Sequence, residues 1–351
     1  MPIRASSLFG LRNQLLGRRY IVDFCDLNAT KALHIGHLRN LALGHALASL
    51  LSSTGGAVTK QSVVCDIGRN VCEALAGYLQ FDAGNAPRDD EKGDSFVGRY
   101  YAAYNAANSI SEIHSDIDPD SPIARELSLH NDLADEILAN WRSGDAVTHA
   151  TWRRLLRWVL DGQNATLARL GIEFDQFLYE SESLDLITGL LDPGLSNRIL
   201  QRLDDGGVAY PTGREFYHQL ILLRSDGFRT EHMRALPLWE RMQRHGHLIE
   251  ACVHVMGKEW VLTTELREEI LRSLGPCPLF DRYHKVAHGM VRPHGSKRKS
   301  SSGEALLIDD AIAKLLLEPI IDDLFLRSRR LIEPEVLCRI ALPGCFFGKS
   351  K

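Results

Sequence analysis

The chain has 351 residues, enough to bury a substantial core in one large domain or two small ones. Its 44 % hydrophobic and 25 % charged content is ordinary for a globular protein, and the net charge of −4 argues against a uniformly basic nucleic-acid binder. The seven cysteines show no Cys-x-x-Cys spacing, so neither a zinc site nor a disulfide framework is indicated. With no run of 18 apolar residues and no signal-peptide pattern, we expect a cytoplasmic protein.

The first quarter of the chain alternates strand and helix patterns. A strand is expected over 20–25, a helix over 38–52, a second strand over 58–65 and a second helix over 70–79. This order predicts an α/β fold with a doubly wound parallel sheet. Ligands of such sheets lie at the carboxyl ends of the strands, where Asp23, Asn28 and Asp66 fall.

The rest of the chain is expected to add a mainly helical insertion, the second half of the sheet and closing helices. We place the boundaries at 1–83, 84–175, 176–292 and 293–351. The elements expected after the insertion are a strand at 177–179, a β-hairpin over 208–223 turned at 211–213, helices at 232–245 and 263–273, strands at 251–256 and 283–291, and helices at 308–326 and 334–342.

The stretch from Asp26 to His37 is the most informative part of the sequence. A strand breaks there into a polar loop and enters a helix whose first turn carries His34, Gly36 and His37. Unpaired amides and the positive end of the helix dipole make such a helix start an anion site. Two imidazoles on one face of that turn suit the charge that develops when a carboxylate attacks a phosphate.

A second candidate lies about 260 residues further on, where residues 297–303 read KRKSSSG. Several cations and hydroxyls in one loop suit the negative charge that shifts onto a leaving pyrophosphate. A solvated basic loop is the plain alternative for this stretch.

The segment His34-Ile35-Gly36-His37 resembles the HIGH signature of class I aminoacyl-tRNA synthetases, a Rossmann-like fold, and the basic loop resembles their KMSKS loop. Arginyl-tRNA synthetase is the most similar member. Further matches in the same order are NxxKxL before HIGHLR, GDSFVG at 93–98, RSDG at 224–227 and HGMV at 288–291. The family also carries an N-terminal and an anticodon-binding domain, for which we see no room here.

The resemblance implies an ATP-dependent ligase that forms an aminoacyl-adenylate, with ATP and Mg²⁺ as cofactors and no protein metal site. The residues that it implies are His34, His37, Lys297 and Lys299 for catalysis; Lys31, Gly36, Gly289, Met290 and Ser301 for ATP; and Asp23, Asn28, Asp66, Glu231 and Glu259 for the amino acid.

Two departures from the family pattern bear on the substrates. A tyrosine and an aspartate usual after RSDG are here Glu231 and Ala235, and Glu259 stands for a glutamine. Because Asp23, Glu231 and Glu259 would favour a cation, we expect arginine or a similar amino acid. Without an anticodon module we expect a small amine or peptide as acceptor. The alternatives are a minimal enzyme that charges tRNA, a non-catalytic regulatory paralogue, and a nucleotidyltransferase of the HIGH superfamily.

Overall fold

The computed structural model describes residues 13–113, 122–243, 248–289 and 306–317. The expected site residues Met290, Lys297, Lys299 and Ser301 therefore lie outside the described residues. The chain divides into two compact units that interleave along the sequence. Of the described residues, unit 1 takes those within 1–27, 39–64 and 173–290, and unit 2 takes those within 28–38, 65–172 and 291–351.

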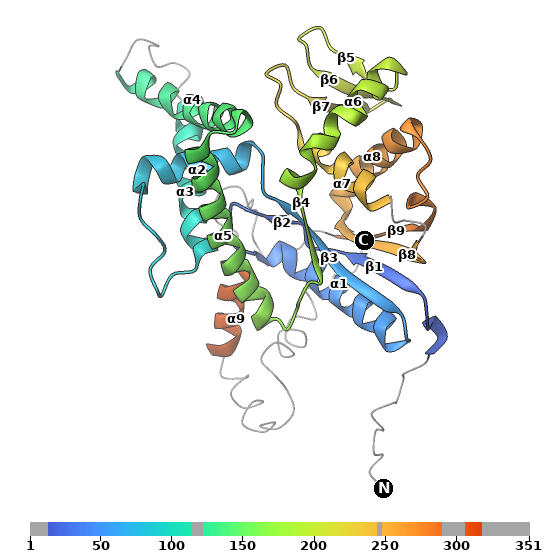
Figure 1. The fold of residues 1–351 in the computed structure, drawn as a ribbon. Coiled ribbons are helices and arrows are strands. Elements are labelled where there is room, and N and C mark those ends of the chain that lie inside the picture. The colour runs from blue at the N-terminus through green and yellow to red at the C-terminus, as the bar shows by residue number, and fades with distance from the viewer. Residues whose placement is uncertain (1–12, 114–121, 244–247, 290–305, 318–351) are drawn as a thin grey trace. The chain divides into compact units, whose positions relative to one another are not determined.

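A mostly parallel sheet is the frame of the fold, with strand order β2-β3-β1-β8-β9 and β4 paired to β3 (Figure 1). β1 lies between β3 and β8 and runs parallel to both, so the chain leaves it in one direction and later returns on the other side. The strands are β1 (Arg19–Asp23), β2 (Leu27–Asn28), β3 (Ala57–Cys65), β4 (Gln176–Tyr179), β8 (Ala251–Gly257) and β9 (Tyr283–His288). This confirms the doubly wound α/β fold.

The helices of unit 1 cover the sheet and build its core. α7 and α8 pack with the second half of the sheet around Trp239, Leu266 and Ile270, all of which are buried. The helices are α1 (Ile35–Ser53), whose first residues belong to unit 2, α6 (Ile187–Ser196), α7 (Glu231–Gln243) and α8 (Val261–Leu274).

A small antiparallel sheet completes unit 1, with β5 (Gln201–Arg202), β6 (Val208–Arg214) and β7 (Tyr217–Leu223) in that order. The hairpin is where we expected it, but its expected turn at 211–213 was wrong. Arg214 pairs with Tyr217, so the chain turns at residues 215–216, and the register shifts between Pro211 and Arg214. Gly213 has φ of +66°. Pro211 and Gly213, which we expected to be turn residues, therefore mark a bulge inside β6.

Unit 2 contains a helical bundle, and helices make up most of its described residues between 93 and 169. Its helices α2, α3, α4 and α5 pack around buried Tyr78, Phe96 and Tyr104 (Figure 1). Edge-to-face aromatic pairs join Tyr78 to Trp158 and Phe96 to Trp158. The helices are α2 (Arg69–Asp82), α3 (Gly93–Ile113), α4 (Pro122–Ser143), α5 (Ala146–Arg169) and α9 (Ile308–Leu317). No helix in the described part of the chain is long and apolar enough to cross a membrane.

Gly44 is a point of close approach between α1 and Phe24, the residue that follows β1. A Cβ atom at this position would lie 2.2 Å from Cγ of Phe24, which is fully buried. We expect Gly44→Ala to lower the free energy of unfolding by about 2 kcal/mol, because the ring has no space to move into. Gly189→Ala on α6 is the matched control, since nothing lies within 4 Å of its added methyl group. Denaturant midpoints check this, and equal midpoints would contradict it.

Candidate active site

The two histidines of the HIGH segment are held by backbone amides at the start of α1. The His34 amide donates to Nδ1 of His37 at 3.1 Å, and the Gly36 amide donates to Nδ1 of His34 at 3.1 Å. The two rings lie 4.0 Å apart between centroids. An Nδ1 that accepts a hydrogen bond carries no proton, so each neutral ring holds its proton on Nε2. The segment thus presents two Nε2–H donors.

Both imidazoles are kept neutral by their surroundings. Burial lowers the pKa of His34 to about 4, and the positive charge of Lys31 adds to this shift. Burial also holds the pKa of His37 well below its usual range, with further contributions from His34 and Lys31. Burial lowers the pKa of Lys31 as well. Lys31, His34 and His37, which we expected to contact ATP, therefore influence one another electrostatically. They supply one cation and two neutral hydrogen-bond donors.

Gly36 is required by the geometry of this turn. A Cβ atom at this position would lie 2.8 Å from both Cε1 and Nδ1 of His34, which is too close for any side chain. A substitution would push the His34 ring away from the amide that orients it. This is a physical reason for the glycine inside the signature.

The depressed pKa of His34 predicts a pH-dependent stability. In the unfolded chain the ring titrates near its ordinary pKa of about 6.5, whereas the folded state keeps it neutral down to about 4. Unfolding therefore takes up a proton below pH 6.5, and stability is lost as the pH falls through this window. We expect His34→Gln to reduce the loss between pH 7 and pH 5 by about 1–2 kcal/mol. Denaturant unfolding at both pH values measures this, and parallel wild-type and variant curves would contradict it.

The loop before the histidines is fixed by a set of amide side chains. Oδ1 of Asn28 accepts from the amide and hydroxyl of Thr30, at 3.0 and 2.6 Å, and from Asn70 at 3.3 Å. Gln163 on α5 donates to the carbonyl groups of Asn28 and Lys31, both at 2.8 Å. The side-chain oxygen of Asn28 thus stabilises the loop. We expected Asn28 to bind the amino acid, and of its side-chain atoms Nδ2 is the one that remains for this contact.

Gln163 is a functional candidate that sequence reasoning missed. It is 1 % exposed, and its Oε1 atom has no hydrogen-bond partner among the described residues. Nothing in the local sequence of a long helix marks this glutamine, because its role depends on a loop more than 130 residues earlier.

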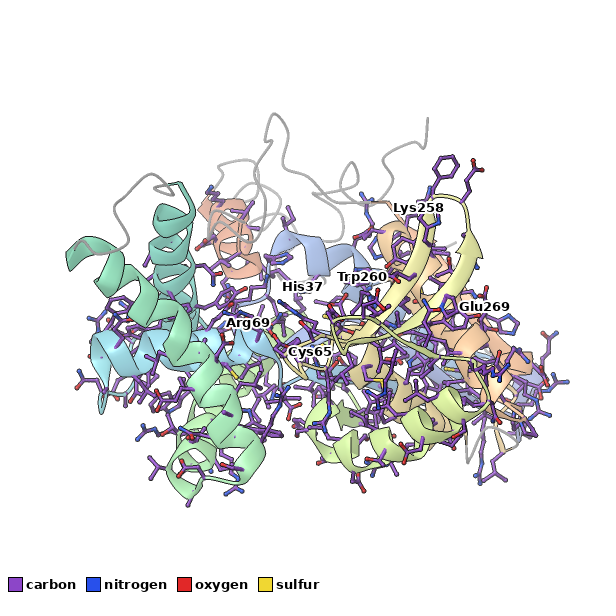
Figure 2. All side chains as sticks on the ribbon, turned by 90° about the horizontal axis from the view of Figure 1, so that it is seen from above. His37, Cys65, Arg69, Lys258, Trp260 and Glu269 are labelled. Atoms are coloured by element: carbon purple, nitrogen blue, oxygen red, sulfur yellow. The ribbon has the colours of Figure 1, made fainter. Side chains whose placement is uncertain are left out.

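Asp66 is the remaining expected site residue among the described residues of unit 2. Asp66 follows β3 and is buried, and its carbonyl oxygen accepts from the Trp152 ring at 2.7 Å. Figure 2 labels His37 on α1, Cys65 at the end of β3 and Arg69 at the start of α2. Arg69 pairs with Glu73 and with Asp135.

Asp23, at the end of β1 in unit 1, is the expected amino-acid ligand with the strongest structural case. It is 1 % exposed, and its Oδ2 atom accepts from Gln61 at 3.1 Å while Oδ1 has no hydrogen-bond partner among the described residues. Burial raises the pKa of Asp23 well above its usual range, and the charge of Asp26 adds to the shift. A cationic group of a ligand would satisfy Oδ1 and restore the charged form.

The other two expected acids are exposed. The side chain of Glu231 is 49 % exposed, and its Oε1 atom lies 3.8 Å from Nε2 of His232. Glu259 is exposed in the short helical turn Lys258–Trp260, and its carboxylate occupies the space where a Cβ atom of Gly257 would stand. In Figure 2, Lys258 and Trp260 mark this turn. Gly289, expected near the adenine, accepts from Arg39 Nη1 at 2.9 Å.

A resident cation stands near Glu231, which sequence reasoning did not anticipate. Arg267 on α8 donates to Nδ1 of His232 at 2.8 Å, and its Nε atom is buried without a hydrogen-bond partner among the described residues. Burial lowers the pKa of Arg267, while the charges of Glu231, Asp26 and Glu180 oppose this shift, in that order. These acids therefore already neutralise a guanidinium of the protein itself.

Comparisons with known proteins identify the family of the chain. A family model described as class I (R) tRNA synthetases, catalytic domain, matches residues 11–310. The arginine–tRNA ligase of Amoebophilus asiaticus is 30 % identical over 305 residues, which cover 84 % of this chain and 50 % of the relative. That of Treponema pallidum is 29 % identical and covers 88 % and 49 %.

Solved structures show the same fold. Arginyl-tRNA synthetase of Thermus thermophilus matches with a TM-score of 0.67 at 20 % identity, over 93 % of this chain and 57 % of that one. The Plasmodium falciparum enzyme matches with a TM-score of 0.60 at 15 % identity, over 93 % and 51 %. The chain spans about half the length of the curated relatives that it matches. It belongs to the family of arginyl-type class I tRNA synthetase catalytic domains.

Proposed function

We propose that the chain activates arginine with ATP and transfers the arginyl group to the 3′ end of a tRNA. An oxygen of the arginine carboxylate attacks the α-phosphorus of ATP, the bond to the β-phosphate oxygen breaks, and pyrophosphate leaves. A ribose hydroxyl of the tRNA then attacks the carbonyl carbon and loses its proton, and AMP leaves. Family membership supports this reaction, and the relatives' names support arginine and tRNA as substrates.

The observation that carries the proposal is the orientation of the two neutral imidazoles. Their Nε2–H groups supply donors that do not carry a charge, at a helix start that already attracts anions. Such fixed donors stabilise charge that develops on the α-phosphate without a cost of reorganisation. We propose Lys31 and Gly36 as neighbours of the ATP phosphates, and Lys297, Lys299 and Ser301 as groups that stabilise the leaving pyrophosphate. When bound with ATP, Mg²⁺ would neutralise the triphosphate.

For the acceptor, the relatives favour tRNA over the small amine or peptide that we expected from the sequence. Both curated relatives are named as ligases of arginine and tRNA. For the amino acid, we propose that Asp23 and Asp66 bind its cationic groups. We propose that Asn28, Glu231 and Glu259 also contribute to its recognition. Asp23 has a buried oxygen with no hydrogen-bond partner in the described part of the chain, as such a role needs.

The test is ATP–pyrophosphate exchange across a panel of amino acids, with and without tRNA, followed by acid precipitation of labelled tRNA. Exchange with arginine and labelling of tRNA would support the proposal. Exchange with arginine together with amide formation on hydroxylamine or a peptide, but no labelled tRNA, would overturn the acceptor. No exchange in any condition would overturn the reaction and favour a regulatory paralogue.

A further inference from the structure

The segment that leads into α9 pairs with the backbone of the HIGH segment. The Ile35 amide donates to the carbonyl of Leu306 at 2.9 Å, and the Ile308 amide donates to the carbonyl of Leu33 at 3.0 Å. His34 stands opposite Leu307 in this short antiparallel bridge. Ile308 is fully buried. Residues 306–308 therefore form a short bridge that supports the turn carrying the imidazoles.

One carboxylate fixes the start of α9 inside unit 2. Oδ2 of Asp309 lies 2.6 Å from Nζ of Lys92 and accepts from the Thr166 hydroxyl at 2.8 Å, while Oδ1 pairs with Arg169. Lys92 and Thr166 lower the pKa of Asp309 against the effect of its burial. Lys92 also pairs with Asp94, which is fully buried, at 3.3 Å. Asp309 thus joins α9 to α5 and to the residue that precedes α3.

The bridge at residues 306–308 and the ion pairs of Asp309 are next to each other in the chain. Asp309 directly follows Ile308, whose amide closes the bridge to the HIGH segment. The amides of His34 and Gly36 in turn orient the two rings. A shift of Asp309 would therefore move residues 306–308, then the backbone at 33–35, and then the Nε2–H donors.

We infer that Asp309 is a positioning residue for His34 and His37, held in place by Lys92, Thr166 and Arg169. Its carboxylate fixes residues 306–308, and the bridge that these residues form fixes the direction of both imidazoles. The inference concerns how the donors are held, and its link to catalysis rests on the proposed function.

The experiment compares Asp309→Asn with Asp310→Asn in the full chain. Asp310 is exposed on the same helical turn and is the matched control. Amide hydrogen exchange at Ile35 and Ile308 reports the bridge directly, because both amides donate in it. We expect both to exchange about tenfold faster in Asp309→Asn and at the wild-type rate in Asp310→Asn. Equal protection in the two variants would overturn the inference.

The kinetic arm separates positioning from general loss of stability. Asp309→Asn should lower kcat of ATP–pyrophosphate exchange about tenfold and leave KM for arginine unchanged, because only donors to the phosphate move. Lys92→Met should give the same pattern, and the double variant should be no worse than either single one. A change in KM alone, or fully additive losses, would contradict the inference. If the wild type shows no exchange, the proposed function fails, and the amide measurement still tests the bridge.

Discussion

His37→Ala is expected to lower kcat of ATP–pyrophosphate exchange by about 100- to 1,000-fold, the range for removing one fixed donor from a developing anion. The ring presents Nε2–H because the His34 amide occupies Nδ1, so its donor direction is set before substrate binds. The loss should appear in kcat more than in KM, since the phosphate gains negative charge only as the reaction proceeds.

Two further variants make this prediction specific. His37→Gln retains an N–H donor at the end of a side chain of similar reach, and we expect it to recover part of the lost rate. His284→Ala removes an exposed histidine from β9 and should leave the rate unchanged. A His37→Ala enzyme with unchanged kcat would contradict the role proposed for the ring.

The fold could be predicted well where local patterns and tertiary packing agree. The strand now bounded as Ala57–Cys65 and the helix Val261–Leu274 differ from their expected bounds by one or two residues, because each is marked by apolar periodicity and flanking turn residues. The hairpin turn was misplaced because Pro211 and Gly213 are signals for an irregular backbone, and a bulge uses the same residues as a turn.

In the candidate site, too, residues that act on near neighbours in the chain could be predicted, and residues that act on distant ones could not. The HIGH segment could be found because its histidines and glycine act within one helical turn, and sequence spacing alone brings them together. Gln163 and Asp309 could not be found, since each acts on residues that lie more than 130 positions away in the chain. A partner at such a separation is set by the packing of helices, for which a single sequence carries no direct signal.

The pocket expected to bind a cationic amino acid shows the same limit. The sequence shows its acidic residues but not the basic residue that packs beside them. Glu231 and Asp26 favour a cation, but Arg267 already supplies one to them. Its guanidinium donates to His232, whose pKa is lowered to about 3, so that the ring is a neutral acceptor and leaves the positive charge of Arg267 in place. A substrate guanidinium that approaches these acids would meet a like charge.

Removing that charge should improve the use of arginine. We expect Arg267→Met to raise kcat/KM for arginine in ATP–pyrophosphate exchange by about 10- to 100-fold, because like charges placed together at a binding site cost several kcal/mol. Methionine keeps an apolar stem against Trp239, whose ring centre lies 6.0 Å from the guanidinium carbon.

Arg267→Lys is the matched control for this experiment, since it changes the shape of the side chain and keeps its charge. It should show no gain with arginine. If Arg267→Met instead loses exchange while Arg267→Lys retains it, the positive charge at this position is needed to hold an anionic group of the substrate. In that case Glu231 and Asp26 serve to keep Arg267 charged against its burial, and the amino acid would be recognised through a carboxylate near α8.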